Sequence, residues 1–170
     1  MNIPELETER LIMRGWRESD LEPMAAFYAD EKSSRFVGGL LSRNMVWRAM
    51  AAYIGHWVLR GYGFWVLEEK ATGEFAGWCG LWFPEGWPEP EIGWGLMPMA
   101  RGKGYATEAA KRARDHAYGE LGWTTAISFI APQNHASRAV AERLGATLDY
   151  ETELFGQPAN VFRHPAPNGI

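Results

Sequence analysis

Cysteine, positive charge and long apolar runs are scarce in this sequence. Its 170 residues include a single cysteine, Cys79, so no disulfide can form within the chain, which fits a reducing cytosol. Asp and Glu number 21 against 17 Lys and Arg. The formal charge of −4 disfavours nucleic acid or an anionic membrane surface as a partner, since both require a basic face. No apolar run approaches the roughly 20 residues that span a bilayer.

The opening residues lack the basic-then-apolar pattern of a signal peptide, so the expected location is cytoplasmic. No internal repeat, low-complexity tract or linker interrupts the chain. With 46% hydrophobic and 22% charged residues, the composition is that of one globular domain able to bury a core without disulfides or metal. We therefore predict a single domain over residues 1–170, with residues 164–170 as a flexible tail.

The order of the apolar patterns predicts a mixed α/β fold. Strands are expected at residues 8–16, 64–67, 75–83, 91–97, 124–130, 147–151 and 160–162, and helices at 19–28, 42–61, after Pro98 and at 134–144. The hairpins in the middle imply antiparallel pairing, whereas the strand–helix alternation of the second half implies parallel pairing. The predicted fold class is α/β: a mixed, partly antiparallel sheet of six to seven strands with helices on both faces.

A basic loop with two glycines, residues 101–106, lies between a predicted strand and a predicted helix. Glycines let the backbone approach a bulky anion, and the helix N-terminus supplies free N–H groups and the positive end of the helix dipole. A P-loop is excluded because position 97 is methionine and Gly104, not Ser or Thr, follows Lys103. A dinucleotide fingerprint lacks its third glycine, at Thr107. The remaining alternative is a loop that only begins a helix.

Two motifs make this chain resemble the GNAT superfamily of N-acetyltransferases. The family's loop pattern, Gln/Arg-x-x-Gly-x-Gly/Ala, is matched by Arg101, Gly104 and Ala106. Residues 130–145 resemble the downstream Asn-x-x-Ser…Leu-Gly element of the RimJ/RimL-type branch, which acetylates the N-termini of ribosomal proteins. Residues 8–14 are similar to the opening of that branch. The likeness covers nearly the whole chain and is tightest over residues 91–145.

The resemblance implies a GNAT-like acyl-CoA N-acyltransferase fold, with acetyl-CoA as co-substrate and no metal. In the family, the loop N–H groups hold the pyrophosphate and a splayed strand binds the pantetheine arm, with a backbone N–H near Met97 facing the thioester oxygen. The implied acetyl-CoA-binding residues are Leu96, Met97, Met99, Arg101, Gly102, Lys103, Gly104, Tyr105, Ala106, Asn134 and Ser137. Gly93 and Gly95 either leave a bare strand face for pantetheine or acceptor, or mark a bulge.

Two residues are candidates for proton transfer. Ser137 matches a position proposed in the family to stabilise or protonate the leaving thiolate, and its alternative is a solvated residue in the first turn of a helix capped by Asn134. Many relatives outside this branch use a tyrosine about seven residues after the asparagine, but position 141 is alanine. Glu91, at the mouth of the splayed strand, is the candidate general base, and its alternative is a solvated glutamate at a strand edge.

The acceptor is an amine whose identity lies outside these motifs. Phe36 and Trp87, both in predicted loops, are the candidates to line its pocket, against ordinary packing. We predict an acetyl-CoA-dependent N-acetyltransferase in which a primary amine, of a peptide N-terminus or a small molecule, attacks the thioester directly. The alternative is a non-catalytic acyl-CoA-binding or sensor module. A homodimer is one option for the oligomeric state.

Overall fold

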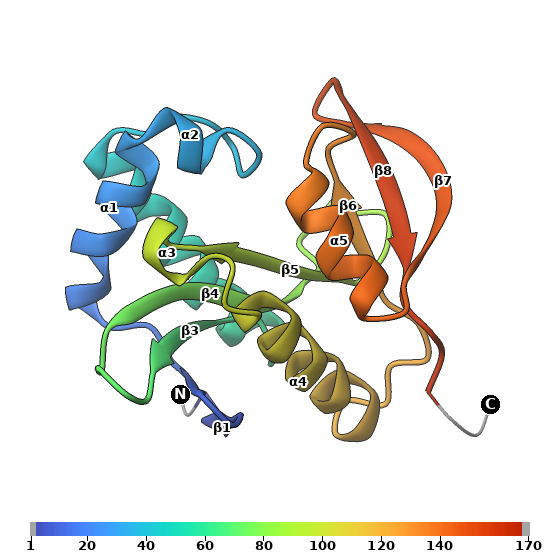
Figure 1. Cartoon of the computed structure of the whole chain (residues 1–170), viewed down its shortest axis with the longest axis horizontal. Coiled ribbons are helices and arrows are strands. Elements are labelled where there is room, and N and C mark those ends of the chain that lie inside the picture. The colour runs from blue at the N-terminus through green and yellow to red at the C-terminus, as the bar shows by residue number, and fades with distance from the viewer. Residues whose placement is uncertain (1–2, 168–170) are drawn as a thin grey trace.

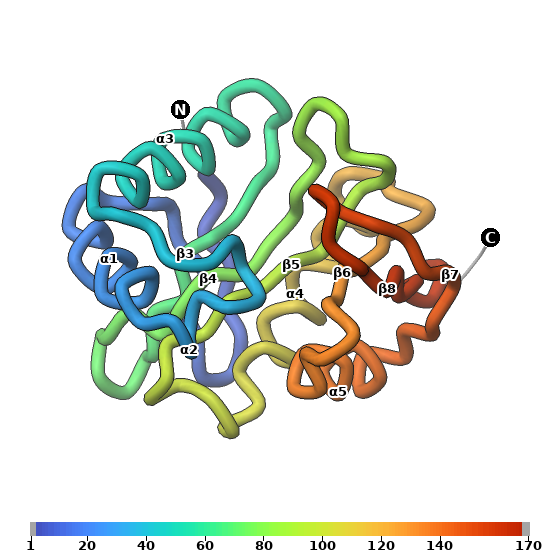
Figure 2. Tube along the Cα trace, turned by 90° about the horizontal axis from the view of Figure 1, so that it is seen from above, coloured from blue at the N-terminus to red at the C-terminus, as the bar shows by residue number. Residues whose placement is uncertain are grey.

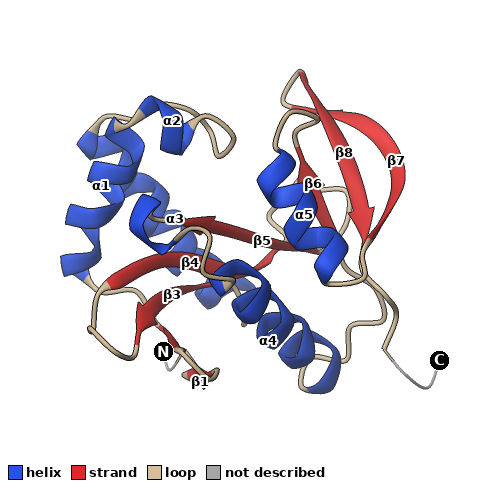
Figure 3. Cartoon of the chain, in the orientation of Figure 1, coloured by secondary structure: helices blue, strands red, loops and turns tan. Residues whose placement is uncertain are grey.

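The computed structural model describes residues 3–167 as eight strands and five α-helices (Figures 1 and 3). The strands are β1 (Leu6–Glu7), β2 (Leu11–Arg14), β3 (Phe64–Glu69), β4 (Phe75–Trp82), β5 (Glu91–Leu96), β6 (Ile127–Ile130), β7 (Thr147–Leu154) and β8 (Gln157–Arg163). The helices are α1 (Leu21–Ala29), α2 (Glu31–Ser34), α3 (Arg43–Arg60), α4 (Tyr105–Gly119) and α5 (His135–Arg143).

All eight strands form one sheet in the order β1-β2-β3-β4-β5-β6-β8-β7. Every neighbouring pair is antiparallel except β5 and β6, which are parallel. The prediction of a mixed, partly antiparallel sheet is confirmed, but the number of strands is eight rather than six or seven. The opening segment forms two strands because Thr8 closes a tight turn, its Oγ1 accepting from Leu11 N at 3.0 Å.

Helices cover both faces of the sheet, as predicted. On one face, α1 and α3 pack together, and Phe27 of α1 meets Trp78 of β4 edge-on with ring centroids 4.8 Å apart. On the other face, α4 lies against β4 and β5 (Figures 1 and 2). The alanines of α4 at 109, 110, 113 and 117 are fully buried. A stripe of small residues lets the helix lie close to the sheet. The short helix α2 was not predicted.

The first residues of the predicted tail, His164 and Pro165, are held against the rest of the protein. His164 is 3% exposed, and the Tyr118 hydroxyl of α4 donates to the carbonyl oxygen of Pro165 at 2.9 Å. The predicted tail therefore cannot begin at residue 164, and its last three residues lie outside the described part. Within residues 3–167, no helix is long and apolar enough to cross a membrane.

Candidate active site

The sheet opens between its two parallel strands. β5 and β6 share a single paired position, Glu91 with Ile127, and then diverge (Figure 1). Beyond that pair, the Ser128 hydroxyl of β6 donates to the carbonyl oxygen of Ile92 on β5 at 2.6 Å. The backbone N–H and C=O groups of the later β5 residues on this edge therefore have no strand partner in β6. A ligand that pairs with a strand needs such free backbone groups.

A buried chain of hydrogen bonds holds the closed end of this opening. Arg114 Nη1 lies 3.3 Å from His164 Nδ1, and His164 Nε2 lies 2.9 Å from Ser128 Oγ. Because arginine only donates, Nδ1 accepts and Nε2 carries the proton donated to the serine. Burial, and then the charge of Arg114, lower the pKa of His164 to about 3, so the ring is neutral at physiological pH. These hydrogen bonds connect α4, β6, β5 and the residue that follows β8.

The predicted phosphate loop, residues 101–106, has the backbone geometry that an anion site requires. Gly102 and Gly104 have φ of 75° and 84°, and Gly104 is the N-cap residue of α4. No side chain in the described part of the protein caps this helix. The N–H groups of its first turn are therefore available to an anion, with the helix dipole behind them.

Arg10, outside the loop, holds the loop in place and is itself held by Glu108. Arg10 Nη1 donates to the carbonyl oxygen of Lys103 at 2.8 Å, and Arg10 Nε donates to Glu108 Oε2 at 2.8 Å. Glu108, in the first turn of α4, also accepts from the Thr8 hydroxyl at 2.6 Å. This set of hydrogen bonds, the Arg10 clamp, was not predicted from the sequence. The likeness of residues 8–14 to the RimJ/RimL-type opening is the feature of the sequence that could have indicated it.

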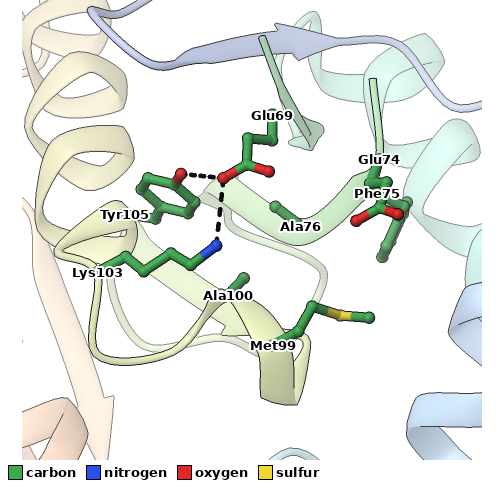
Figure 4. A pocket seen from close by; sticks show the side chains of 8 residues that line it. All are labelled: Glu69, Glu74, Phe75, Ala76, Met99, Ala100, Lys103 and Tyr105. Atoms are coloured by element: carbon green, nitrogen blue, oxygen red, sulfur yellow. Dashed lines mark hydrogen bonds and ion pairs between the residues drawn. The ribbon is translucent and has the colours of Figure 1, made fainter. Parts of the chain in front are cut away.

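The two basic side chains of the loop, Lys103 and Arg101, each have a partner within the protein. Lys103 Nζ lies 3.3 Å from Glu69, which also bonds the Tyr105 hydroxyl, and these groups line a pocket of about 20 Å³ (Figure 4). That volume holds nothing larger than a water molecule. Arg101 is exposed, and its Nε donates to the carbonyl oxygen of Leu96 at 3.1 Å. Since exposed ion pairs are weak, Lys103 can be released toward an anion at little cost.

The helix α5 borders the opening with its N-terminus. Asn134 is its N-cap residue and accepts from Ser137 N at 3.2 Å. The Ser137 hydroxyl accepts from the indole N–H of Trp94, on β5, at 3.3 Å. Ala141 is fully buried in a cluster against which Trp94 packs. A tyrosine at position 141 would have to displace that packing, so its absence here has a structural reason.

Glu91 lies at the point where β5 and β6 part, and it is buried at 8% exposure. Its carboxylate accepts from Trp87 Nε1 at 2.9 Å and from Phe129 N at 3.2 Å. Burial raises the pKa of this carboxyl from 4.5 to about 7, although the two hydrogen bonds oppose the rise. The alternative of a solvated edge glutamate is therefore wrong. Glu91 is a buried base with a pKa near neutrality.

The structure makes one prediction about β5 more specific and corrects another. The N–H of Met97 itself donates to the carbonyl oxygen of Ala76 on β4 at 2.9 Å, so an N–H near Met97 that faces a thioester must belong to a neighbouring residue. The strand face above Gly93 and Gly95 is not bare. A Cβ on Gly95 would lie 2.4 Å from the ring of Trp78, and one on Gly93 would lie 3.2 Å from the ring of Phe64.

The remaining predicted site residues are placed as follows. Trp87 contacts Glu91, whereas Phe36 is 37% exposed beside the guanidinium of Arg35, and none of its described contacts joins it to Glu91. Met99 is 61% exposed beside the phosphate loop. Among residues 3–167, no three His, Cys, Asp or Glu side chains are grouped to hold a metal ion.

A sheet that opens between two parallel strands, beside an uncapped helix N-terminus and a buried carboxyl group, can bind an extended anionic ligand next to a base. The sequence model of the family described as "Acetyltransferase (GNAT) domain" matches residues 10–147. The chain belongs to this family, and the GNAT fold predicted from the sequence is confirmed.

Individual relatives agree with this assignment. An acetyltransferase from Agrobacterium tumefaciens strain C58 superposes with a TM-score of 0.88 at 35% identity, over 97% of this chain and 96% of that one. The Bacillus subtilis protein YkkB is 34% identical over 114 residues, which are 64% of this chain and 66% of YkkB, just under two thirds of its length. The ribosomal L7/L12 acetyltransferase RimL, solved with coenzyme A, shares the fold at a TM-score of 0.77 and 19% identity, over 95% of this chain and 97% of that chain.

A first prediction concerns the phosphate loop. Replacing Gly104 by Val places a branched side chain at φ 84°, on the backbone that would approach a phosphate bound at this loop. Losing two charge-assisted hydrogen bonds at about 1.5 kcal/mol each should weaken CoA binding about a hundredfold in titration calorimetry.

Gly122→Val is the control for this variant. Its φ of 69° imposes the same backbone strain in the segment after α4, away from the loop. It should lower the melting temperature while CoA affinity stays within about twofold of wild type. Unchanged CoA affinity in a folded Gly104→Val protein would place the phosphates elsewhere.

Proposed function

We propose that this enzyme transfers the acetyl group of acetyl-CoA to a primary amine, by direct attack of the amine on the thioester. The observation that carries the proposal is Glu91, buried at the fork of β5 and β6 with its carboxylate held by Trp87 and Phe129. A base in this position receives the proton that the amine loses as it attacks. With a pKa of about 7, about half of these carboxyl groups are ionised near neutral pH and able to accept a proton.

The acceptor is a peptide N-terminus or a small amine. An α-amine with a pKa of about 7.7–8.0 is already partly neutral at neutral pH, so one base of matched pKa suffices. A lysine, with a pKa of about 10.4, would be almost wholly protonated. RimL, named as an acetyltransferase of the α-amine of a ribosomal protein, resembles this chain in fold alone, so the choice between the two acceptor kinds falls to experiment.

The residues of the opening supply the remaining groups. The N–H groups of residues 102–106 would hold the pyrophosphate, with Arg101 and Lys103 adding charge. Successive strand residues direct their N–H groups to opposite edges, so Leu96 N–H faces the opening when Met97 N–H faces β4. We assign the polarisation of the thioester oxygen to the Leu96 N–H. Asn134 caps α5 beside the pantetheine path, and Ser137 would protonate the departing thiolate.

Release of CoA thiol, followed with a thiol reagent across a panel of amines and N-terminal peptides, tests the function. We expect amine-dependent thiol release, and an upward melting shift with millimolar CoA, because a ligand at 100 times its dissociation constant stabilises by about 2.7 kcal/mol. A melting shift without thiol release for any amine would instead identify the non-catalytic acyl-CoA-binding module. Neither signal, alongside an active reference acetyltransferase, would refute the proposal.

A further inference from the structure

The turn between β7 and β8 carries a residue that its backbone disfavours. Leu154 pairs with Gln157, so the loop is the two residues Phe155 and Gly156, with φ of 50° and 73°. Positive φ at both positions is the pattern of a type I′ turn, for which Asn, Asp and Gly are preferred. Phe155 is the sole non-glycine residue with positive φ in the described part of the chain.

Packing of the Phe155 side chain within the protein does not offset the cost of its positive φ. The side chain of Phe155 is 85% exposed, so it contributes little apolar burial to the folded state. A costly backbone conformation that brings no burial is a reason to look for a function.

The ring of Phe155 stands at the end of a short path to Glu91. Its centroid lies 5.7 Å from that of Trp87, which in turn meets Phe129 edge-on at 5.6 Å. The indole N–H of Trp87 donates to the Glu91 carboxylate, and Phe129 N donates to the same group. In Figure 2 the tip of the β7–β8 hairpin lies beside the loop that precedes β5, which carries Trp87. Three aromatic rings from three parts of the sequence are thus in contact with one another, and Trp87 Nε1 and the Phe129 backbone N–H connect this group to one buried base.

We propose that Phe155 determines acceptor specificity, forming with Trp87 and Phe129 an apolar wall for a large apolar or aromatic group close to the acceptor's amine. The inference rests on the proposed function, because the amine is placed by Glu91. Glu91 can accept a proton from the amine, and the aromatic rings can contact an apolar group of the acceptor that lies a few atoms from that amine. An exposed ring gains apolar contact only when such a group covers it. The acceptor class is therefore a primary amine bearing a bulky apolar substituent.

The test compares 2-phenylethylamine with ethylamine as acceptors at saturating acetyl-CoA, with kcat/KM expressed per neutral amine because alkyl amines, like lysine, are mostly protonated at neutral pH. Wild type should acetylate 2-phenylethylamine with a kcat/KM at least about tenfold higher, the usual size of a discrimination made by an apolar pocket. Phe155→Asn removes the ring and supplies a residue that the turn prefers. It should raise the KM for 2-phenylethylamine about tenfold, leave kcat and the ethylamine reaction unchanged, and not lower the melting temperature.

Leu59→Asn is the matched control. Leu59 is 84% exposed on α3, so this variant removes an equally exposed apolar side chain away from Glu91 and should preserve the ratio of the two amines. Equal kcat/KM for the two amines in wild type, or a preference that survives Phe155→Asn, would overturn the inference while leaving acetyl transfer intact. Failure to acetylate either amine or any member of the wider panel would overturn the proposed function, and this inference with it.

Discussion

Replacing Glu91 by Gln should lower kcat/KM at pH 8 by about 10²–10⁴-fold, the usual loss when a general base is removed. The pKa of the wild-type carboxyl is about 7, so wild-type kcat/KM should rise with pH through that value as Glu91 ionises. At higher pH any further rise in kcat/KM should follow only the ionisation of the amine. The glutamine cannot accept the proton, so this rise should disappear in the variant. A kcat/KM profile from pH 6 to 9, measured with one amine, checks both expectations.

The same substitution should make the protein more stable at alkaline pH. The folded state raises the pKa of Glu91 from 4.5 to about 7, so between these values the folded chain binds more protons than the unfolded chain. Stability contributed by this group is present below pH 4.5 and is lost as pH rises to about 7. At about 1.36 kcal/mol per pH unit, keeping the ionised group buried costs about 3 kcal/mol.

Part of that gain is offset in the variant. Glutamine keeps one acceptor oxygen for the two donors, Trp87 Nε1 and Phe129 N, and the lost hydrogen bond costs about 1 kcal/mol. The free energy of unfolding should increase by about 2 kcal/mol at pH 8, and below pH 4.5 it should instead decrease by about 1 kcal/mol, because only the loss of the hydrogen bond remains there. Urea titrations at the two pH values measure it.

Glu89→Gln provides the control for both measurements. Glu89 lies two residues away, but its hydrogen bond with Arg163 lowers the pKa of its carboxyl. Its replacement should leave kcat/KM within about threefold of wild type and should not stabilise the protein. Activity of Glu91→Gln that equals this control across the pH range would remove Glu91 from the mechanism.

The parts of the site that follow one strand-to-helix transition could be predicted from sequence. The phosphate loop, the Asn134 cap and the position of Glu91 all depend on neighbours close in the chain. The Trp87–Glu91 contact spans four residues, and the sequence indicates the two residues separately, Glu91 as a base and Trp87 as part of an acceptor pocket. Local spacing and the family likeness carried this information.

Contacts between distant segments could not be predicted in this way. The clamp by Arg10 joins residues 98 apart, and the hydrogen bond from Trp94 to Ser137 joins residues 43 apart. The choice between the N–H groups of Leu96 and Met97 depends on strand register, because a slip of one residue reverses the edge to which each points. The positive φ of Phe155 could not be predicted from sequence, because it depends on the strand pairing that makes Phe155 and Gly156 a two-residue turn.

The hydroxyl of Ser137 is the second group whose removal should have a large effect. The indole N–H of Trp94 donates to its oxygen, and the hydroxyl proton is then free to point toward another acceptor. In the proposed reaction that acceptor is the thiolate of CoA, which develops only as the thioester breaks. Ser137→Ala should therefore lower kcat while the dissociation constant of acetyl-CoA changes little.

The size of this loss separates two proton sources. General-acid catalysis contributes about 10²–10⁴-fold, and the N-terminus of α5 already favours a developing anion, so we expect a loss near 10²-fold. Trp94→Phe keeps the serine but removes the donor that orients it, and should cost less than Ser137→Ala. Turnover of Ser137→Ala within twofold of wild type, at saturating acetyl-CoA with chemistry shown to be rate-limiting, would assign the proton to water. Ser137 would then serve only as the residue whose N–H closes the Asn134 cap.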